Sequence, residues 1–403
     1  MAYDTTYGAF LPVGDVRPVE DGSRFTAASQ SAPTKELFSV NIKQLGWNAH
    51  FESHFESCQG QNLVPARVVR AGGGFYSLLN ADGEQTATLA GQLRHTSSQD
   101  ALPAVGDWVA IDSPVEGGIR IHAVLPRQTA LKRATAGNRK GLAEKPGCPQ
   151  VLAANVDTAI IVSGLDNDYN PRRIERYLTL VYESGAAPVI VLNKSDLCPE
   201  TQTLRAEVEA IAFGTPVLVT NARSGEGLAE LAPHLEAGRT LVLLGSSGAG
   251  KSTLLNQLAC ADHQQTSEVS TAVGKGTHTT THRELFPLPG GALVIDTPGL
   301  RELHLWGESE ASLESTFPEI VAHATQCRFS NCQHENEPDC GIRQALIEGT
   351  LDAARLESYL KQRAELAYAT QRHELATQVA QKRKRKAIPR EAKRWRREHG
   401  DGQ

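Results

Sequence analysis

The sequence has no apolar run long enough to span a membrane, and its first residues lack the basic stretch and apolar core of a secretion signal. It also lacks a disulfide framework, because its seven cysteines are odd in number and scattered along the chain. These absences argue against export and against a membrane partner. We therefore expect a cytoplasmic protein in a reducing compartment, with a monomer as the default state.

The basic residues are unevenly distributed. The 403 residues, 40% of them hydrophobic and 22% charged, are enough for two or three globular domains, and the net charge is −5. Residues 382–398, however, contain ten lysines or arginines against two glutamates. This basic segment is either a solvated face or a contact for a polyanion such as RNA.

Two regions of the chain have different strand patterns. Residues 62–131 contain short strand-like runs separated by turns, which predict a small β-barrel of about five strands. In residues 150–316, short apolar strands alternate with helices, which predicts a doubly wound parallel α/β sheet. The expected order is a flexible arm (1–61), the barrel (62–131), a basic linker (132–149), the α/β domain (150–316), a helical subdomain (317–378) and a basic tail (379–403).

A glycine-rich loop follows the predicted strand 240–244 and opens a helix at Lys251. Its glycines allow backbone N–H groups to approach phosphates, and the helix N-terminus adds partial positive charge. We expect Lys251 to reach the β- and γ-phosphates of a nucleotide and the Ser252 hydroxyl to bind Mg²⁺. The sequence therefore predicts a phosphate-binding loop, with an accidental glycine turn as the alternative.

Asp296 and Gly299 come directly after the apolar strand 292–295. At this position a carboxylate holds Mg²⁺ and a glycine N–H senses the γ-phosphate. The polar segment 274–282 has the composition of a switch ordered by γ-phosphate and Mg²⁺, and either Thr279 or Thr280 is its expected metal ligand. An exposed threonine-rich loop is the alternative for that segment.

Asn193-Lys194-Ser195-Asp196 follows the strand 188–192, so that the Asp196 carboxylate can accept two hydrogen bonds from guanine. Adenine offers no such donor pair, which favours GTP over ATP. Asn221 and Ala222 stand where a base-supporting loop is expected. The predicted nucleotide-binding residues are Asn193, Lys194, Ser195, Asp196, Asn221, Ala222, Gly245, Ser246, Ser247, Gly248, Ala249, Gly250, Lys251, Ser252 and Thr253.

The base-reading motif precedes the phosphate loop, the reverse of the order in an ordinary guanine-nucleotide switch. This order predicts a circularly permuted GTPase domain. Further along, Cys327, Cys332, His334 and Cys340 lie within fourteen residues. Three thiolates and one imidazole complete a tetrahedral Zn²⁺ shell, so we expect a structural zinc site in the helical subdomain.

The motif order, together with a barrel containing Gly106-Asp107-Trp108-Val109, resembles the RsgA (YjeQ) family of bacterial GTPases. The resemblance covers roughly residues 63–370. It implies an N-terminal OB-fold, a permuted GTPase domain and a C-terminal zinc subdomain. It further implies binding to the small ribosomal subunit and its rRNA, assistance in late maturation, and GTP hydrolysis stimulated by that subunit.

The residue that orients the attacking water is less evident. Leu300 stands where many switch GTPases have a glutamine, so we expect slow intrinsic hydrolysis. His278 resembles the family's proposed catalytic histidine, although a solvated and idle histidine is equally consistent with the sequence. Lys251 and Gly299 are the other expected catalytic residues. A nucleotide-gated RNA-binding scaffold with little turnover, and a GTPase of large-subunit assembly, are the alternative functions.

Overall fold

The computed structural model describes most of the chain from residue 41 to residue 378. Within these residues no helix combines the length and the apolar character needed to cross a bilayer. The predicted positions His278, Thr279, Thr280 and Gly299 and the basic tail lie outside the described residues. The described residues are 41–58, 63–96, 99–112, 118–134, 149–260, 283–296, 310–371, 374–375 and 378.

The predicted barrel is a closed ring of five strands. Strand β1 pairs with both β2 and β4, β2 pairs with β3, β3 runs parallel to β5, and β5 returns to β4. Its buried interior is aliphatic and includes Val68, Leu78 and Ile111. Ring closure with one parallel pair is the arrangement of an OB-fold. The elements are β1 (Leu63–Gly72), β2 (Phe75–Asn80), β3 (Gly83–Leu89), α2 (Gly91–Thr96), β4 (Trp108–Asp112) and β5 (Ile119–Val124).

Residues 41–58, the end of the predicted arm, form the 3-10 helix η1 (Ile42–Leu45) and helix α1 (Ala49–Glu56). The Asn48 side chain caps α1 by accepting from backbone N–H groups. The Trp47 ring lies 4.7 Å, centroid to centroid, from that of Trp108 in the barrel. Phe51 on α1 is 1% exposed and packs on the same ring. Aromatic burial therefore fixes this part of the arm against the barrel.

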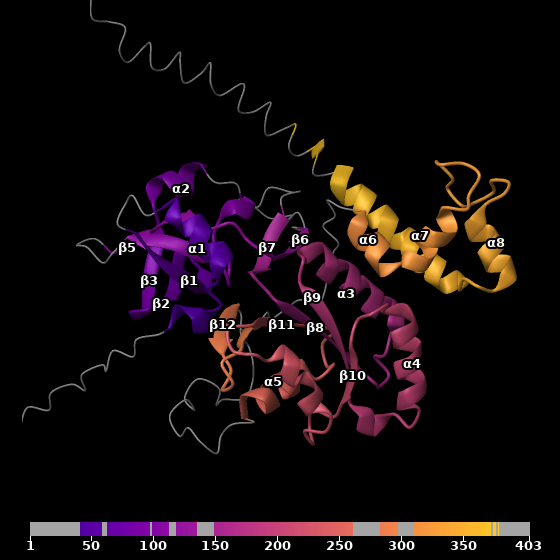
Figure 1. The fold of residues 1–403 in the computed structure, drawn as a ribbon, viewed down its shortest axis with the longest axis horizontal. Helices are drawn as coiled ribbons and strands as arrows, with labels where there is room; N and C mark the ends of the chain where they lie inside the picture. Colours follow the sequence, from indigo (N-terminus) through magenta and orange to yellow (C-terminus); the bar gives the residue numbers. More distant parts are fainter. Residues whose placement is uncertain are drawn as a thin grey trace, which may run out of the picture. The chain divides into compact units, whose positions relative to one another are not determined.

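In the α/β domain, six strands of the larger sheet follow one another in the order β10-β9-β8-β11-β13-β12. Figure 1 labels all of them except β13. These strands are parallel except β12, which runs antiparallel to β13. Strand β11 lies between β8 and β13, so the strand that leads into the phosphate loop is central in space although late in sequence. The strands are β8 (Thr158–Gly164), β9 (Ala187–Asn193), β10 (Val217–Thr220), β11 (Thr240–Leu244), β12 (Glu284–Pro287) and β13 (Leu293–Asp296).

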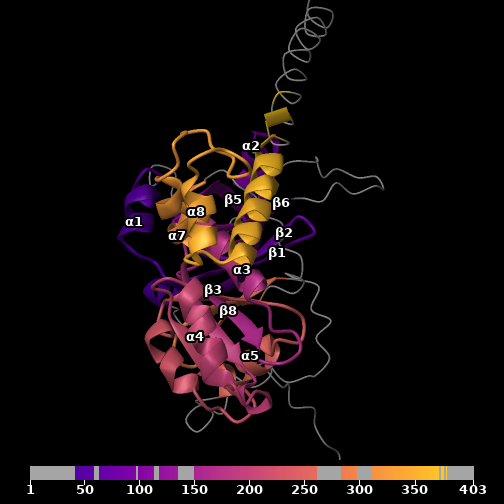
Figure 2. The same ribbon diagram turned by 90° about the vertical axis from the view of Figure 1, so that its right-hand side faces the viewer.

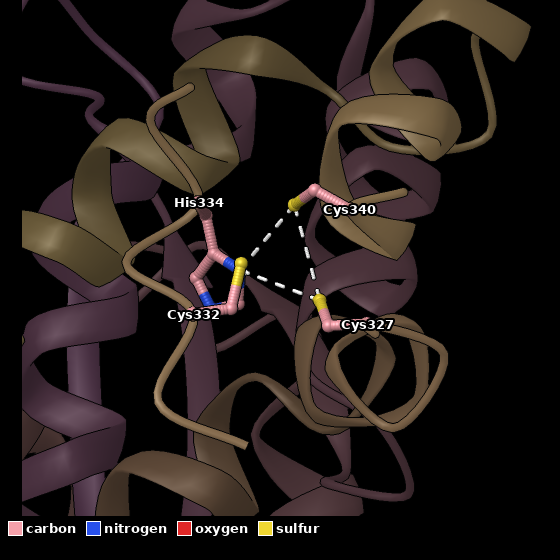
Figure 3. A group of neighbouring side chains, drawn as sticks. All are labelled: Cys327, Cys332, His334 and Cys340. Carbon is pink, nitrogen blue, oxygen red and sulfur yellow. Dashed lines mark hydrogen bonds between the residues drawn. The ribbon is translucent and has the colours of Figure 1, made fainter. Parts of the chain in front are cut away.

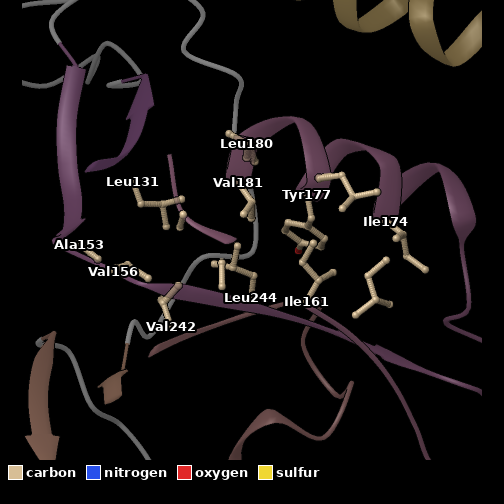
Figure 4. Packing of buried hydrophobic residues seen from close by; sticks show 14 of the residues in the cluster. Leu131, Ala153, Val156, Ile161, Ile174, Tyr177, Leu180, Val181, Val242 and Leu244 are labelled. Atoms are coloured by element: carbon tan, nitrogen blue, oxygen red, sulfur yellow. The ribbon is translucent and has the colours of Figure 1, made fainter. Parts of the chain in front are cut away.

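Both faces of this sheet are buried, as the continuous apolar runs predict. Ile161 and Val242 face helix α3 (Pro171–Ser184), as Figure 4 shows. The neighbouring residues Ile160 and Leu241 belong to the cluster that includes Leu254 of α5 (Lys251–Cys260). Asn170 caps the start of helix α3, and Gly185, whose φ of 82° is left-handed, caps its end. Helix α4 (Thr201–Ile211) connects β9 to β10.

The barrel and the α/β sheet are joined in two ways. Strand β1 pairs with β12 at Arg70 and Glu284, whose side chains also form an ion pair. Arg67, 1% exposed, donates hydrogen bonds to the Asn155 carbonyl at 3.2 Å and to Thr240 Oγ1 at 2.8 Å. The junction therefore combines a partly exposed ion pair with the buried hydrogen bonds of Arg67. Strands β6 (Ala130–Ala134) and β7 (Pro149–Ala154), at the two ends of the predicted linker, form a separate antiparallel pair.

The helical subdomain packs against α3. It consists of α6 (Ala311–Thr316), α7 (Pro318–Ala324), α8 (Gly341–Glu348) and a C-terminal helix, residues 353–371, coloured orange to yellow in Figure 2. The Glu175 carboxylate of α3 is fully buried, and its Oε1 lies 2.8 Å from Arg355 Nη1. Ser358 donates a hydrogen bond to the other Glu175 oxygen at 2.5 Å. A buried charge pair thus attaches the C-terminal helix to the α/β domain.

Replacing Arg355 by alanine is expected to destabilise this attachment by about 3–5 kcal/mol, because Glu175 is left as a buried charge without its main partner. Arg355 also donates to Glu319 Oε1 at 2.6 Å and to the Thr316 carbonyl at 2.7 Å. We expect faster hydrogen exchange in residues 353–371 and an earlier urea transition by circular dichroism.

The matched control is Arg172→Ala, which also removes a partner of Glu175. Its side chain is 33% exposed, whereas that of Arg355 is 5% exposed. Exposed pairs contribute about 0–1 kcal/mol, so the Arg172 variant should stay close to the unmodified protein. Equal effects of the two variants would show that burial of the pair is not what stabilises the attachment.

Candidate nucleotide site and metal centre

The glycine-rich loop connects β11 to α5 along a path that only glycine can follow. Gly245 has a φ of 143°, and a Cβ there would lie 2.2 Å from the Val162 carbonyl oxygen of the neighbouring strand. Gly250 has a φ of 98°, and a Cβ there would lie 2.1 Å from Asn193 Nδ2. These close approaches hold the loop against the ends of β8 and β9. Backbone N–H groups and the start of α5 can then face an anion.

Lys251 reaches back over this loop from the first turn of α5. Its Nζ donates to the carbonyl oxygens of Gly245 at 2.8 Å and of Ser246 at 2.6 Å. The next two residues, Ser252 and Thr253, are exposed, as is Ser247 in the loop. A positive charge and free hydroxyls therefore stand at the end of the sheet where the sequence predicts phosphates.

Asn193 joins the three predicted nucleotide-binding segments. Its Nδ2 donates to the Ala249 carbonyl of the phosphate loop at 3.0 Å. Its Oδ1 accepts from the Ala222 backbone N–H at 2.9 Å and from Thr220 at 3.2 Å. Asn221 Oδ1 accepts from the Arg223 N–H at 3.1 Å and so stabilises the turn after β10. Asn193 is 2% exposed, and its buried hydrogen bonds hold the end of β9, the phosphate loop and the turn after β10 together.

Asp196 lies in the 3-10 helix η4 (Ser195–Leu197) and is exposed. Within the described part of the chain, no side-chain or backbone group bonds to its carboxylate. The preceding Lys194 adopts a left-handed φ of 65° and donates to Asp166 at 2.5 Å. That hydrogen bond lowers the pKa of Asp166 below its ordinary value. Asp196 thus has the exposure that reading a ligand requires.

Sequence reasoning missed the loop between β8 and α3. There Asp168 accepts hydrogen bonds from Arg173 Nη1 at 2.8 and 2.7 Å and from the Ser246 hydroxyl of the phosphate loop. Together these donors lower the pKa of Asp168. The sequence could have indicated this loop, because Asp166 and Asp168 follow the buried parallel strand β8. Ligands of such sheets bind at the carboxyl ends of the strands.

Asp296 ends β13, whose neighbour β11 leads into the phosphate loop with Val242 opposite Ile295. The carboxylate and Ser252 therefore lie at the same edge of the sheet. His278, Thr279, Thr280 and Gly299 fall outside the described residues, so their expected roles remain predictions.

The predicted metal ligands converge in the helical subdomain (Figure 3). Cys327 Sγ lies 3.6 Å from His334 Nδ1 and 3.8 Å from Cys340 Sγ, and Cys340 Sγ lies 3.6 Å from His334 Nδ1. The ligand atoms of these residues and Cys332 all lie within 4.8 Å of one another. Tetrahedral zinc with bonds of about 2.3 Å to sulfur and 2.0 Å to nitrogen separates its ligands by about 3.5–3.8 Å. The arrangement fits zinc.

Local structure explains how these ligands meet. Cys340 is the N-cap residue of α8, where backbone N–H groups of Ile342 and Arg343 favour the thiolate. Burial alone would raise the pKa of Cys340, but these contacts and the neighbouring thiols lower it. His334 takes a left-handed φ of 67°. Glu337 accepts from the backbone N–H groups of Gln333 and Glu335 at 2.7 and 3.0 Å and so fixes the intervening loop.

The chain is similar in sequence to relatives of known family. Residues 124–306 match the RsgA GTPase family. A curated protein of Syntrophotalea carbinolica named small ribosomal subunit biogenesis GTPase RsgA is 82% identical over 364 residues, which cover 90% of this chain and 100% of the relative. The chain belongs to the RsgA GTPase family. An RsgA of Opitutus terrae is 50% identical over 83% of this chain and 92% of its own length.

Solved structures agree with this membership. YjeQ from Thermotoga maritima is 28% identical with a TM-score of 0.56, covering 76% of this chain and 99% of that one. YloQ, described as a circularly permuted GTPase, is 25% identical with a TM-score of 0.54, covering 77% and 96%. The predicted permutation and fold class are confirmed, and RsgA membership makes the chain a GTP hydrolase.

Proposed function

We propose that this chain is a cytoplasmic GTPase that assists late maturation of the small ribosomal subunit and hydrolyses GTP faster when bound to that subunit. The observation that carries the proposal is the joint presence of a permuted nucleotide site, a closed barrel and a Cys3His cluster. Curated relatives that are 82% and 50% identical bear the name of small ribosomal subunit biogenesis GTPases.

In this proposal the described residues bind GTP in three places. Asp196 binds the guanine base, since its carboxylate is exposed. The hydrogen bond from Asn193 to Ala249 holds the loop that carries Asp196 beside the phosphate loop. Lys251 and backbone N–H groups of the loop hold the phosphates. Asn221 and Ala222 support the base from the turn after β10.

Ser252 and Asp296 would hold Mg²⁺ together with Thr279 or Thr280, and the ion would neutralise charge on the phosphate oxygens. Lys251 stabilises negative charge that develops on those oxygens during hydrolysis. Gly299 is assigned to γ-phosphate sensing. His278 is assigned to orienting the attacking water, a role that binding to the small subunit would favour.

The barrel and the zinc-binding subdomain are the proposed rRNA-binding parts. The subdomain loop presents Arg328 over the ring of Phe329, 5.5 Å from its centroid, and Phe329 is 42% exposed. A cation beside an exposed ring is suited to a phosphate backbone and an unstacked base. The basic tail, residues 379–403, would add phosphate contacts.

Purified protein at fixed low salt is expected to hydrolyse GTP slowly alone and at least about tenfold faster with small ribosomal subunits, since activating partners accelerate other GTPases by up to about 10³- to 10⁵-fold. The measurement is phosphate release under single-turnover conditions. Large subunits serve as the matched control, because they offer similar RNA charge without the specific partner.

Stimulation by large subunits alone would contradict the small-subunit assignment. GTP binding without stimulation by either subunit would instead support a nucleotide-gated RNA-binding scaffold.

An Asp196→Asn variant should reverse the base preference and bind XTP better than GTP, because the amide replaces one acceptor by a donor. This variant tests the base assignment independently of the ribosome.

A further inference from the structure

Asp168, which belongs to none of the nucleotide motifs, contacts both the phosphate loop and helix α3. The Ser246 hydroxyl of the phosphate loop donates to one of its oxygens, and Arg173 of α3 donates to both, at 2.8 and 2.7 Å. Asp168 itself belongs to the loop between β8 and α3. One side chain therefore joins the phosphate loop to the first turn of this helix.

Ser246 is held from two sides. Its hydroxyl bonds to Asp168, and its carbonyl oxygen accepts from Lys251 Nζ at 2.6 Å. A backbone movement of Ser246 that breaks the first contact would also displace the carbonyl that accepts from the ammonium. The place of the Lys251 charge is thus linked to the carboxylate of Asp168.

Helix α3 continues this link to the helical subdomain. Thr179 donates to Gln362 Oε1 of the C-terminal helix at 2.8 Å, and Glu175 bonds to Arg355 and Ser358 of the same helix. The Thr179 and Glu175 side chains are completely buried. Because buried polar contacts fix one arrangement of two packed helices, a shift of α3 has to be shared by its partner.

From this arrangement we infer that Asp168 is a positioning residue of the nucleotide site, which fixes the phosphate loop at Ser246 and links the state of this loop through α3 to the C-terminal helix. The inference rests on the proposed GTPase function. It adds a residue outside the nucleotide motifs and a route from the site to the zinc-binding subdomain.

The first test is equilibrium binding of a fluorescent GTP analogue, with Mg²⁺, to the full chain. Hydrogen bonds to charged groups are stronger than neutral ones, and the partial exposure of Asp168 weakens this one. We therefore expect about tenfold weaker binding for Asp168→Ala and for Ser246→Ala. The double variant should bind no more weakly than either single variant, because both changes remove the same contact.

Two further measurements distinguish a positioning role of Asp168 from a purely structural one. Asp168→Asn keeps an acceptor for the Ser246 hydroxyl and loses only the exposed ion pair with Arg173, so it should retain most of the affinity. In hydrolysis, Asp168→Ala should raise KM about tenfold and lower kcat far less than Lys251→Ala does, since the Lys251 ammonium is displaced but not removed. Glu207→Gln is the matched control, because Glu207 bonds to Tyr169 beside Asp168 and not to the phosphate loop.

The second test is hydrogen exchange of residues 353–371 with and without the GTP analogue. Binding should change exchange in the unmodified chain and in Glu207→Gln, and this response should be lost in Asp168→Ala at saturating nucleotide. A response retained in Asp168→Ala would overturn the link to the C-terminal helix.

Binding by Asp168→Ala equal to that of Glu207→Gln, or additive losses in the double variant, would overturn the positioning role. Failure of the unmodified chain to bind GTP would overturn the proposed function instead, so the two failures are distinguishable. Asp168 is 38% exposed at its side chain. Ser246→Ala removes the same contact from the other side and provides a second variant should Asp168→Ala fold poorly.

Discussion

Replacement of Lys251 by alanine is expected to lower kcat for GTP hydrolysis by about 10²- to 10³-fold, as does the loss of one preorganised electrostatic contact in other enzymes. The ammonium lies 2.8 and 2.6 Å from two carbonyl oxygens of the phosphate loop. It is therefore placed at the loop, where bound phosphates would exchange these carbonyl contacts for charge-assisted ones. Phosphate release in single-turnover experiments measures the effect.

Lys361→Ala is the matched control, because Lys361 is exposed on the C-terminal helix. It removes the same charge without touching the phosphate loop and should hydrolyse GTP at the unmodified basal rate. Lys251→Arg is not expected to restore activity, since a planar guanidinium does not replace a compact ammonium within a tight loop. Near-normal hydrolysis by Lys251→Ala would contradict the assignment of Lys251 to stabilisation of the transition state.

The nucleotide loops were predictable because each follows a buried strand. Apolar runs such as 240–244 cannot be placed at a surface, so the glycines and Lys251 that follow had to lie at a sheet edge. The cap Asn170 and the stop Gly185 likewise fixed both ends of α3. Motif order then implied the permutation, which the position of β11 between β8 and β13 confirms.

Contacts between distant residues were not predictable in the same way. Asp168 and Ser246 are 78 positions apart, so no local spacing indicates that they meet. Glu175 looks like part of a charged, solvated helix face, yet it is fully buried because Arg355 and Ser358 cover it from the C-terminal helix. Helix α1 has only eight residues, too short for a clear 3.6-residue repeat.

The metal cluster was predictable from spacing because its four ligands are close in sequence as well as in space. Replacing Cys332 by serine is expected to lower zinc affinity by more than about 100-fold, since even changes behind the ligands lower it by about 10- to 100-fold. The loop from Cys327 to Cys340 buries few apolar side chains of its own. Without metal it should lose its order, which hydrogen exchange of this loop and zinc content by mass spectrometry would detect.

The helices around the cluster should respond less than the loop. Arg355 and Gln362 hold the C-terminal helix on α3 through Glu175 and Thr179, contacts that involve no metal ligand. Exchange in residues 353–371 should therefore stay slow in Cys332→Ser. Cys198→Ser is the matched control, because that thiol lies near η4 and should leave zinc content unchanged. Equal zinc content in the two variants would contradict the assignment, whereas loss of zinc with an intact C-terminal helix would show that the metal stabilises the loop and α3 stabilises the helix.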